Sequence, residues 1–375
     1  MKFVILYLIA FTSTITFAQT IRIADNNANA PTGANIYTTL QAAIDAAVAD
    51  DIVYITPSVT SYGNATVGKR ITIKGVGFGI TEIAPRGSSV GILTIVNSSN
   101  GTDNISGLIL TGFSFSTITF AAGTGSSPYN NIVADNITGG SFNHTACLPS
   151  ATDNLTIRNS LINAINLGFC TGTSNVKIYR NINNVSFDIR NSSNALFSNN
   201  LFISTAQFNT EGTSAGIRIE NNIFSGSGDS FYRLVDALVI NNIFYGKTPN
   251  GATSPFHSNT FSNNLVLNAF TFPPTASGGP VNSGVNNITG TGPLFTSAPV
   301  TPAYNSTYDY TLQAGSPCIG AATTGENIGP SGGLYPWTGN LTLKPSNVPV
   351  ITEFGNSGVV PQNQPLKSNI KAKSN

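Results

Sequence analysis

A short phrase of apolar and polar residues recurs through the middle of the chain. It reads apolar, any residue, Asn, Asn, apolar, and it occupies residues 197–201, 219–223, 239–243 and 261–265. The second Asn lies at positions 200, 222, 242 and 264, so it advances by 22, 20 and 22 residues. A repeat of about 20 to 25 residues is typical of a solenoid, in which each repeat buries its apolar side by stacking on its neighbours. We therefore predict a stack of β coils.

The second Asn also indexes the neighbouring coils. Matching positions are Gly112, Asn136 and Ser160 on the N-terminal side, and apolar columns run three residues before the index and one residue after it, for example Ile109, Val133 and Ile157 in the first column. Asn tolerates left-handed backbone geometry, and its amide can form hydrogen bonds along a stack. We expect a structural ladder of these residues: Asn181, Asn200, Asn222, Asn242, Asn264 and Asn287.

Other elements are predicted at both ends of the stack. Strands are expected at 21–24 and 52–55, and an amphipathic helix at about 39–49 would cover the open N-terminal end. Repeat coils should span about 67–290, and a closing coil about 305–337. The remaining residues, 338–375, read as an extended tail with a short strand near 350–354. We therefore predict one β-helix domain over 19–337.

The N-terminus resembles a targeting segment. Lys2 precedes an apolar run that ends in Thr16-Phe17-Ala18, where small residues occupy both positions that a signal peptidase reads. We place the signal peptide at 1–18. A membrane anchor is the less favoured alternative because the run is short and contains Ser and Thr. The mature chain should then be secreted or held at the cell surface, with no membrane span after signal removal.

The composition limits the kinds of partner that the chain can bind. Charged residues make up 9% of the chain, and the net charge is +1, which provides no field for nucleic acid or an anionic membrane. The three cysteines form no C-x-x-C pair. Cys147 and Cys170 lie one coil apart, so a disulfide and two reduced buried thiols both remain open, and Cys318 has no obvious partner.

Three segments together resemble the pectin-lyase-like family of right-handed parallel β-helices found among exported bacterial proteins. They are the helix and strands within 40–77, the Asn-Asn phrase, and Ser316-Pro317-Cys318-Ile319-Gly320-Ala321. The resemblance covers about 20–337, and it implies an all-β fold: a single-stranded right-handed parallel β-helix with an N-terminal amphipathic capping helix. The family's activities vary, so the resemblance does not fix one. It alone implies a possible calcium ion; the residues themselves predict no metal site and no cofactor.

A strip of outward residues is the first candidate site. Positions two and four before the index should face outward on neighbouring rungs about 4.8 Å apart. They include Arg158, Lys177, Tyr179, Arg218 and Glu220. Basic and aromatic side chains suit an acidic or neutral sugar chain, although a solvated face with incidental charges is the simpler interpretation.

Later positions of the coils form a second candidate cluster. Its members are His144, Asp188, Glu211, Asp229 and Arg233. A lone His near an Asp is weak grounds for acid–base chemistry, and structural roles are favoured. The coils contain no Asp-x-Asp pair of the kind that a calcium-dependent lyase would use.

The favoured function is non-catalytic contact with an extracellular or cell-surface polysaccharide by a monomer. The alternative is a polysaccharide lyase or glycoside hydrolase acting on an acidic polysaccharide, with the first strip supplying base and anion-holding groups.

Overall fold

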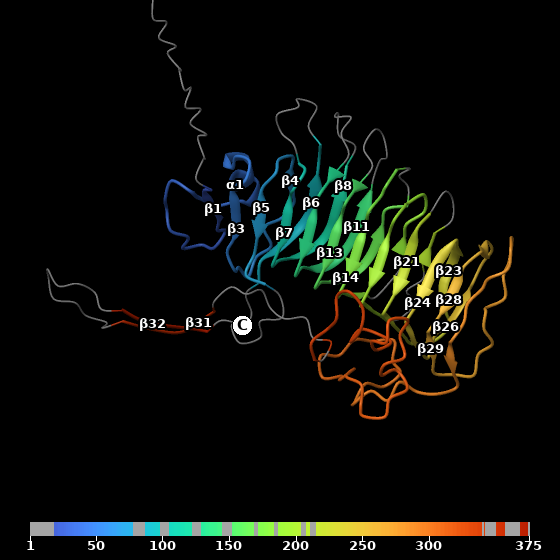
Figure 1. The fold of residues 1–375 in the computed structure, drawn as a ribbon. Coiled ribbons are helices and arrows are strands. Elements are labelled where there is room, and N and C mark those ends of the chain that lie inside the picture. Colours follow the sequence, from blue (N-terminus) through green and yellow to red (C-terminus); the bar gives the residue numbers. More distant parts are fainter. Residues whose placement is uncertain are drawn as a thin grey trace, which may run out of the picture.

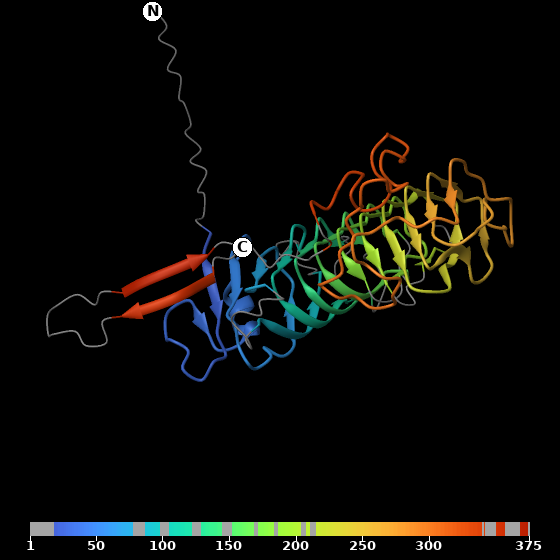
Figure 2. The ribbon, with the colours of Figure 1, turned by 90° about the horizontal axis from the view of Figure 1, so that it is seen from below.

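The computed structural model describes residues 19–77, 87–97, 105–121, 129–144, 152–168, 172–183, 187–203, 208–210, 215–339 and 341, and the backbone alone of 350–356 and 368–373. The expected signal peptide, Cys147, Cys170 and Glu211 lie outside these residues. The described chain forms an elongated stack of coils that runs from the blue N-terminal end to the yellow coils (Figures 1 and 2).

One long parallel sheet follows the stack from end to end. Each strand pairs with the strand one coil away, and the order within the described residues is β2-β1-β3-β5-β7-β10-β13-β15-β18-β21-β24-β28. The strands are β1 (Ile21–Ala24), β2 (Ile36–Tyr37), β3 (Ile52–Ile55), β5 (Thr72–Lys74), β7 (Ile109–Thr111), β10 (Val133–Asp135), β13 (Thr156–Arg158), β15 (Lys177–Tyr179), β18 (Leu196–Ser198), β21 (Ile217–Glu220), β24 (Ala237–Ile240) and β28 (Thr260–Ser262).

A second parallel sheet follows the turn that ends each strand of the first. Its strands are β4 (Ala65–Val67), β6 (Ser89–Ile95), β8 (Ser114–Phe120), β11 (Thr138–His144), β14 (Leu161–Asn166), β16 (Ile182–Asn183), β17 (Phe187–Asp188), β19 (Leu201–Phe202), β20 (Phe208–Asn209), β22 (Ile223–Ser225), β23 (Asp229–Val235), β25 (Ile243–Tyr245), β26 (Thr248–Gly251), β27 (Phe256–His257), β29 (Leu265–Val266) and β30 (Ile288–Thr289). A short pair, β9 (Tyr129–Asn130) and β12 (Thr152–Asp153), adds to the coils. The predicted right-handed parallel β-helix is confirmed.

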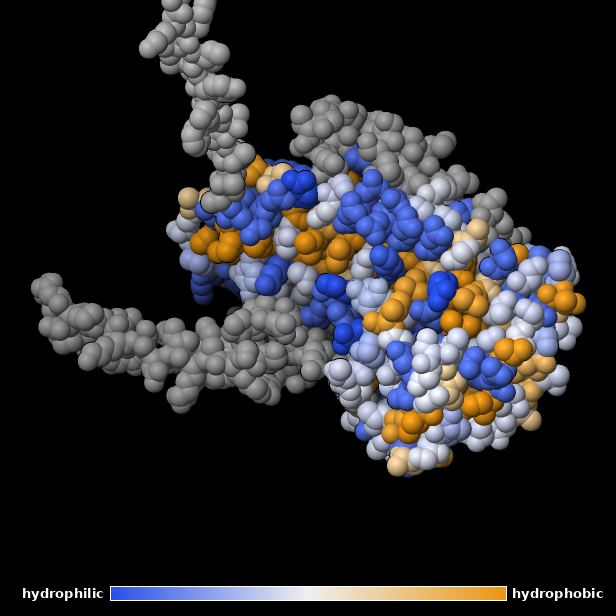
Figure 3. Space-filling model, viewed as in Figure 1, coloured by the Kyte–Doolittle hydropathy of each residue, from blue (hydrophilic) through white to orange (hydrophobic). Residues whose placement is uncertain are grey.

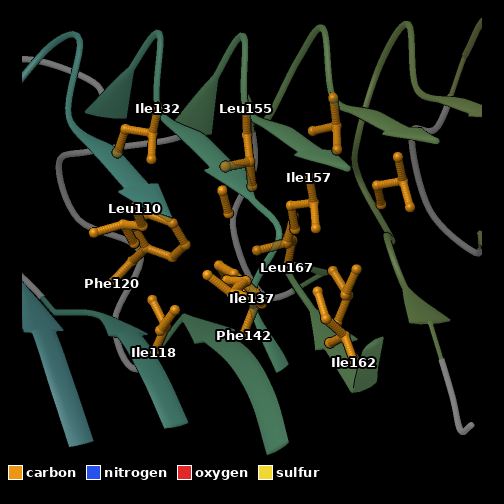
Figure 4. Packing of buried hydrophobic residues seen from close by; sticks show 14 of the residues in the cluster. Leu110, Ile118, Phe120, Ile132, Ile137, Phe142, Leu155, Ile157, Ile162 and Leu167 are labelled. Carbon is orange, nitrogen blue, oxygen red and sulfur yellow. The ribbon is translucent and has the colours of Figure 1, made fainter. Parts of the chain in front are cut away.

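Alternation of side chains separates the surface of the coils from their interior. The visible outer face carries hydrophilic and hydrophobic residues in neighbouring patches (Figure 3). Inward positions are apolar and closed to solvent; Leu110, Ile157 and Phe142, for example, point into the same core (Figure 4). Because each coil stacks on the next, residues of one kind meet in rows, as where the rings of Phe224 and Phe244 stack at 4.9 Å.

The two residues of the Asn-Asn phrase have different roles. The first Asn adopts the left-handed conformation that turns the chain from one sheet to the other, with φ of 55° at Asn199 and 56° at Asn221. The second Asn is buried and bonds to the coils on both sides. Asn222 Oδ1 accepts from the backbone N–H of Asn200 at 2.9 Å, and Asn222 Nδ2 donates to Asn242 Oδ1 at 2.9 Å. The same contacts recur between other coils and form a continuous buried row, made by Asn181, Asn200, Asn222, Asn242, Asn264 and Asn287.

The sequence index is wrong by one residue in the two coils before Ser160. Leu110 and Ala134, not Ile109 and Val133, pair in register with the buried Ile157. Gly112 and Asn136 therefore take the left-handed position of the first Asn. The reason is that Phe113 and Ile137 fill the buried position where later coils have Ser160 or Asn, so the apolar pattern is displaced by one.

A short helix covers the N-terminal end, as expected. It is α1 (Leu40–Ala46), and the Thr39 hydroxyl accepts from the backbone N–H of Ala42 at its start. The helix ends before the predicted residue 49 because Ala47 is already extended, with ψ of 145°. The buried Asp51 carboxylate then accepts from the N–H of Val48 and from the N–H of Thr20, which ties the helix end to β1.

The segment expected to form the last coil of the stack packs against the side of the coils instead. Residues 293–341, here called the C-terminal lobe, lie along the side of the green and yellow coils (Figures 1 and 2). Their apolar side chains, including Phe295, Ile328 and Trp337, pack on one outward column of the coils. That column is the apolar residue after each second Asn: Ile182, Leu201, Ile223, Ile243 and Leu265. The prediction of a closing coil at 305–337 is therefore wrong, because an apolar outer column provides a better place to bury this segment.

The last described elements are β31 (Val350–Asn356) and β32 (Ser368–Lys373), which pair antiparallel. The strand expected near 350–354 falls within β31. Across the described residues, no helix combines the length and apolar character needed to cross a bilayer.

Candidate functional site

The outer face of the first sheet carries the first predicted strip in two parallel rows. Register pairing aligns one row, here called the Tyr179 row: Asp135, Arg158, Tyr179, Ser198 and Glu220. It aligns the second, the Lys177 row: Thr156, Lys177, Leu196, Arg218 and Leu238. All five predicted strip residues thus lie on one face, over strands β13, β15 and β21.

Arg158 is fixed at the N-terminal end of this face by two partners. Its Nη2 lies 3.0 Å from Asp135 Oδ2, and its Nη1 donates to the Tyr179 hydroxyl at 3.2 Å. Partial burial opposes the charge, but the bonds to Tyr179 and Asp135 outweigh it and raise the pKa of Arg158. Since 40% of its side chain remains exposed, the guanidinium can still contact a ligand.

Arg218 and Glu220 form a second pair, two residues apart on β21. Arg218 Nη2 lies 2.7 Å from Glu220 Oε2, and Arg218 Nε donates to the same oxygen at 3.2 Å. The Arg218 side chain is 50% exposed while the Glu220 side chain is only 5% exposed. The pair therefore presents its positive partner to solvent.

The C-terminal lobe docks on the first Asn of successive turns. Asn199 Nδ2 donates to the carbonyl oxygens of Pro330 and Gly332, at 3.0 and 2.6 Å. Asn221 Nδ2 donates to the carbonyl of Gly329 at 3.2 Å. The backbone N–H of Gly329 returns a bond to the carbonyl of Asn241 at 2.8 Å. Side chains that the left-handed turns direct outward therefore hold the lobe through its backbone.

Close approach and aromatic contacts complete this docking. Gly329 has a φ of +86°, and a Cβ there would lie 2.4 Å from Ile243 Cδ1, so only glycine fits without a shift. The buried Trp337 donates its indole N–H to the carbonyl of Asn199 at 2.6 Å, and the guanidinium of Arg180 lies 5.4 Å from its ring centroid.

The lobe also brings an aromatic ring to the site. Tyr335 stacks on Tyr179 with ring centroids 3.8 Å apart. Burial, reinforced by the neighbouring Tyr179 and Glu220, raises the pKa of Tyr335. Ser198 and Glu220 are buried beside the lobe, whereas Lys177 stays exposed. The lobe thus borders the Tyr179 row and leaves the Lys177 row open to solvent.

His144, a predicted member of the second cluster, lies inside the coils. Its ring stacks on Phe120 at 4.9 Å, and its Nε2 is 2.6 Å from the Thr152 hydroxyl. Burial lowers the pKa of His144 to about 4. Asp188 pairs with the outward Asn166, whereas His144 pairs with the inward Phe120, so the two side chains lie on opposite sides of the second sheet.

The other described members of that cluster have separate partners. Asp188 forms a bidentate ion pair with Arg190, with Nη2–Oδ2 at 2.7 Å. Asp229 Oδ1 accepts from the Thr248 hydroxyl at 2.7 Å. The ammonium of Lys247, which is 1% exposed, donates to the backbone carbonyl of Asp229, and burial lowers the pKa of that lysine.

Arg233 lies over the ring of Tyr232, with its guanidinium carbon 5.1 Å from the centroid, and pairs in register with Asn209. Glu211, the remaining member of the cluster, lies outside the described residues.

Sequence reasoning missed two members of the first site. Asp135 escaped because the index was displaced by one residue in its coil, although its pairing with Arg158 follows from the corrected register. Tyr335 escaped because no repeat position points to it. A signal for the lobe was present, however, since alternation from a buried Asn places the next residue outside, where a column of Ile and Leu needs a cover.

The chemistry open to this face is limited by the position of its carboxylates. Asp135 and Glu220 lie four rungs apart, about 19 Å, whereas glycosidases place two carboxylates about 5 to 10 Å apart. Across the described residues, no group of three or more His, Cys, Asp or Glu side chains is arranged to hold a metal ion. Cys318 is a buried free thiol in the lobe.

Similarity to known proteins is found at the level of the backbone. No family model matches the sequence, and no curated protein matches it. Among solved structures, the chain is similar to pectate lyase Pel9A, with a TM-score of 0.42 and 15% identity over 84% of this chain and 96% of that chain. This similarity concerns the path of the backbone. The parallel β-helix itself is established by the strand pairing within the described residues.

Proposed function

We propose that the protein is exported and binds an acidic polysaccharide along the outer face of the first sheet, without cleaving it. The observation that carries this proposal is the presence of Arg158, Lys177 and Arg218 on one face within four consecutive rungs, beside the stacked pair of Tyr179 and Tyr335. Exposed guanidinium and ammonium groups suit carboxylate or sulfate groups on a sugar chain. Export rests on the N-terminal sequence alone.

The proposal favours binding over catalysis for two reasons. Arg158 and Arg218 are each paired with a carboxylate, which positions their guanidinium groups to contact an anion. Neither is then available to act as a general base. The carboxylates of the face are too far apart to act as a hydrolytic pair. Contacts made at exposed ion pairs are individually weak, so affinity would come from several rungs acting together.

Affinity electrophoresis with a panel of acidic and neutral polysaccharides tests the proposal. Lys177→Ala and Arg218→Ala should each weaken binding about fivefold, and added salt should weaken the wild type. Arg70→Ala is the matched control because Arg70 pairs with Asp50 at 2.6 Å near the capping helix, away from this face. Equal losses in all three variants, or no retention by any acidic polymer, would contradict the proposal.

The same samples test the alternative of a lyase or hydrolase. Ultraviolet absorbance of unsaturated products, or new reducing ends, that disappear in Arg158→Ala and Arg218→Ala would replace the binding proposal with an enzymatic one.

A further inference from the structure

The Lys177 row alternates in chemistry from rung to rung. Strands β15, β18, β21 and β24 present Lys177, Leu196, Arg218 and Leu238 in register. Lys177 is exposed, Arg218 is half exposed, and both leucines are partly exposed. The two cations are therefore two rungs apart, about 10 Å, and each is followed by an aliphatic side chain.

The charges beside this row limit how many anions it can accept. The two rows together contain three cations, Arg158, Lys177 and Arg218, and two carboxylates, Asp135 and Glu220, which gives a net charge of +1. A polymer with an anion on every sugar would place some of its anions on the leucine rungs, which carry no cation in either row and flank the rung of Glu220. Those anions would lose water without gaining a partner, which is unfavourable.

The leucine rungs suit a different kind of sugar. An uncharged sugar has C–H faces, and their contact with the Leu196 and Leu238 side chains removes apolar surface from water. The cations on either side of Leu196 then meet acidic groups two sugars apart.

We propose that the ligand of this face is an alternating polysaccharide, with one anionic and one uncharged sugar in each repeat. This inference rests on the function proposed above and narrows it to one class of polymer.

Direct comparison of two probe polymers in the same buffer tests the inference with the full chain. Hyaluronan alternates a uronate with an uncharged N-acetylhexosamine, and polygalacturonate carries a carboxylate on every sugar. The wild type should bind hyaluronan more tightly at equal ionic strength, and Lys177→Ala and Arg218→Ala should each reduce that binding about fivefold.

A gain of charge between the two cations provides the sharper experiment. Leu196→Lys should shift the ratio of affinities toward polygalacturonate about fivefold, whereas Leu196→Gln, which adds no charge, should not. Because a lysine between Lys177 and Arg218 can destabilise the sheet, Leu238→Lys provides a second variant with the same expected shift.

The results separate this inference from the function beneath it. Polygalacturonate binding as tight as hyaluronan binding, with losses in Lys177→Ala and Arg218→Ala, would overturn the alternating ligand and keep the polysaccharide-binding face. An unchanged ratio in Leu196→Lys and Leu238→Lys would overturn it equally. Binding that is unchanged in Lys177→Ala and Arg218→Ala would overturn both the alternating ligand and the polysaccharide-binding face.

Discussion

Replacing Asn222 by Ala probes what holds the coils in register. The Asn222 side chain is fully buried. It makes four hydrogen bonds, accepting from the backbone N–H and the Nδ2 of Asn200 and donating to Phe197 O and Asn242 Oδ1, all between 2.9 and 3.0 Å. At about 1 kcal/mol net for each bond, the loss in free energy of unfolding is about 4 kcal/mol. The backbone N–H of Asn200, left without its acceptor, accounts for part of this loss, because an unpaired buried donor costs about 1–3 kcal/mol by itself.

Urea unfolding followed by circular dichroism measures this loss. Asn166→Ala is the control, since Asn166 is an outward residue on β14 whose Nδ2 makes one partly buried bond to Asn143 Oδ1. Its cost should stay below about 1 kcal/mol. Hydrogen exchange should increase in the coils that contain Asn200, Asn222 and Asn242 and remain unchanged near β7, because each coil contacts its neighbours alone.

The outcome that refutes this reasoning is a free-energy loss in Asn222→Ala no larger than that in Asn166→Ala. Exchange that increases equally along the whole stack would also contradict it. Polysaccharide binding below the unfolding transition should be unchanged, because Asn222 lies inside the coils and the Lys177 row lies on their outer face.

Three further measurements test other parts of the structure. Burial lowers the pKa of His144 to about 4, so the folded state resists protonation. The free energy of unfolding should therefore fall by about 3 kcal/mol as pH drops from about 6.5 to 4, and His144→Phe should flatten that slope in unfolding curves taken across this range. Burial raises the pKa of the Cys318 thiol to about 12, so iodoacetamide should leave it unmodified until urea unfolds the chain; labelling of the native protein at this residue would contradict its burial. Asn199→Gly keeps the left-handed turn and removes the two bonds to the lobe, so the emission of Trp337, the only tryptophan, should shift to the red while the far-ultraviolet spectrum persists; an unchanged emission maximum would show that these bonds do not hold the lobe.

The repetitive part of the fold follows from the sequence because its signal is repeated. Each coil offers a fresh copy of the same pattern, so an error in one coil is corrected by the others. Where the copies differ, the prediction fails: Phe113 and Ile137 occupy the buried position of the second Asn, and the pattern there is displaced by one residue. The end of the capping helix was also misplaced, because Asp51 determines it through contacts with β1.

The site was only partly predictable for a related reason. Arg158, Lys177 and Arg218 lie on regular strands, so counting residues places them on one face. Tyr335 reaches that face from a segment without regular strands, far along the chain, and no local pattern encodes such a contact. His144 was included in the second cluster for its chemistry, although a structural role was favoured, and it lies in the core.

The way the lobe is attached has a consequence for how this protein can change during evolution. The lobe contacts the turns at Asn199, Asn221 and Asn241. These turns lie on successive rungs of the stack, although 22 and 20 residues separate them along the chain. Insertions and deletions elsewhere in a coil leave that spacing untouched. Loss or duplication of a whole coil in this region would move every later anchor by one rung. Selection can therefore vary the lengths of the distant loops freely, whereas the number of coils beneath the lobe is constrained.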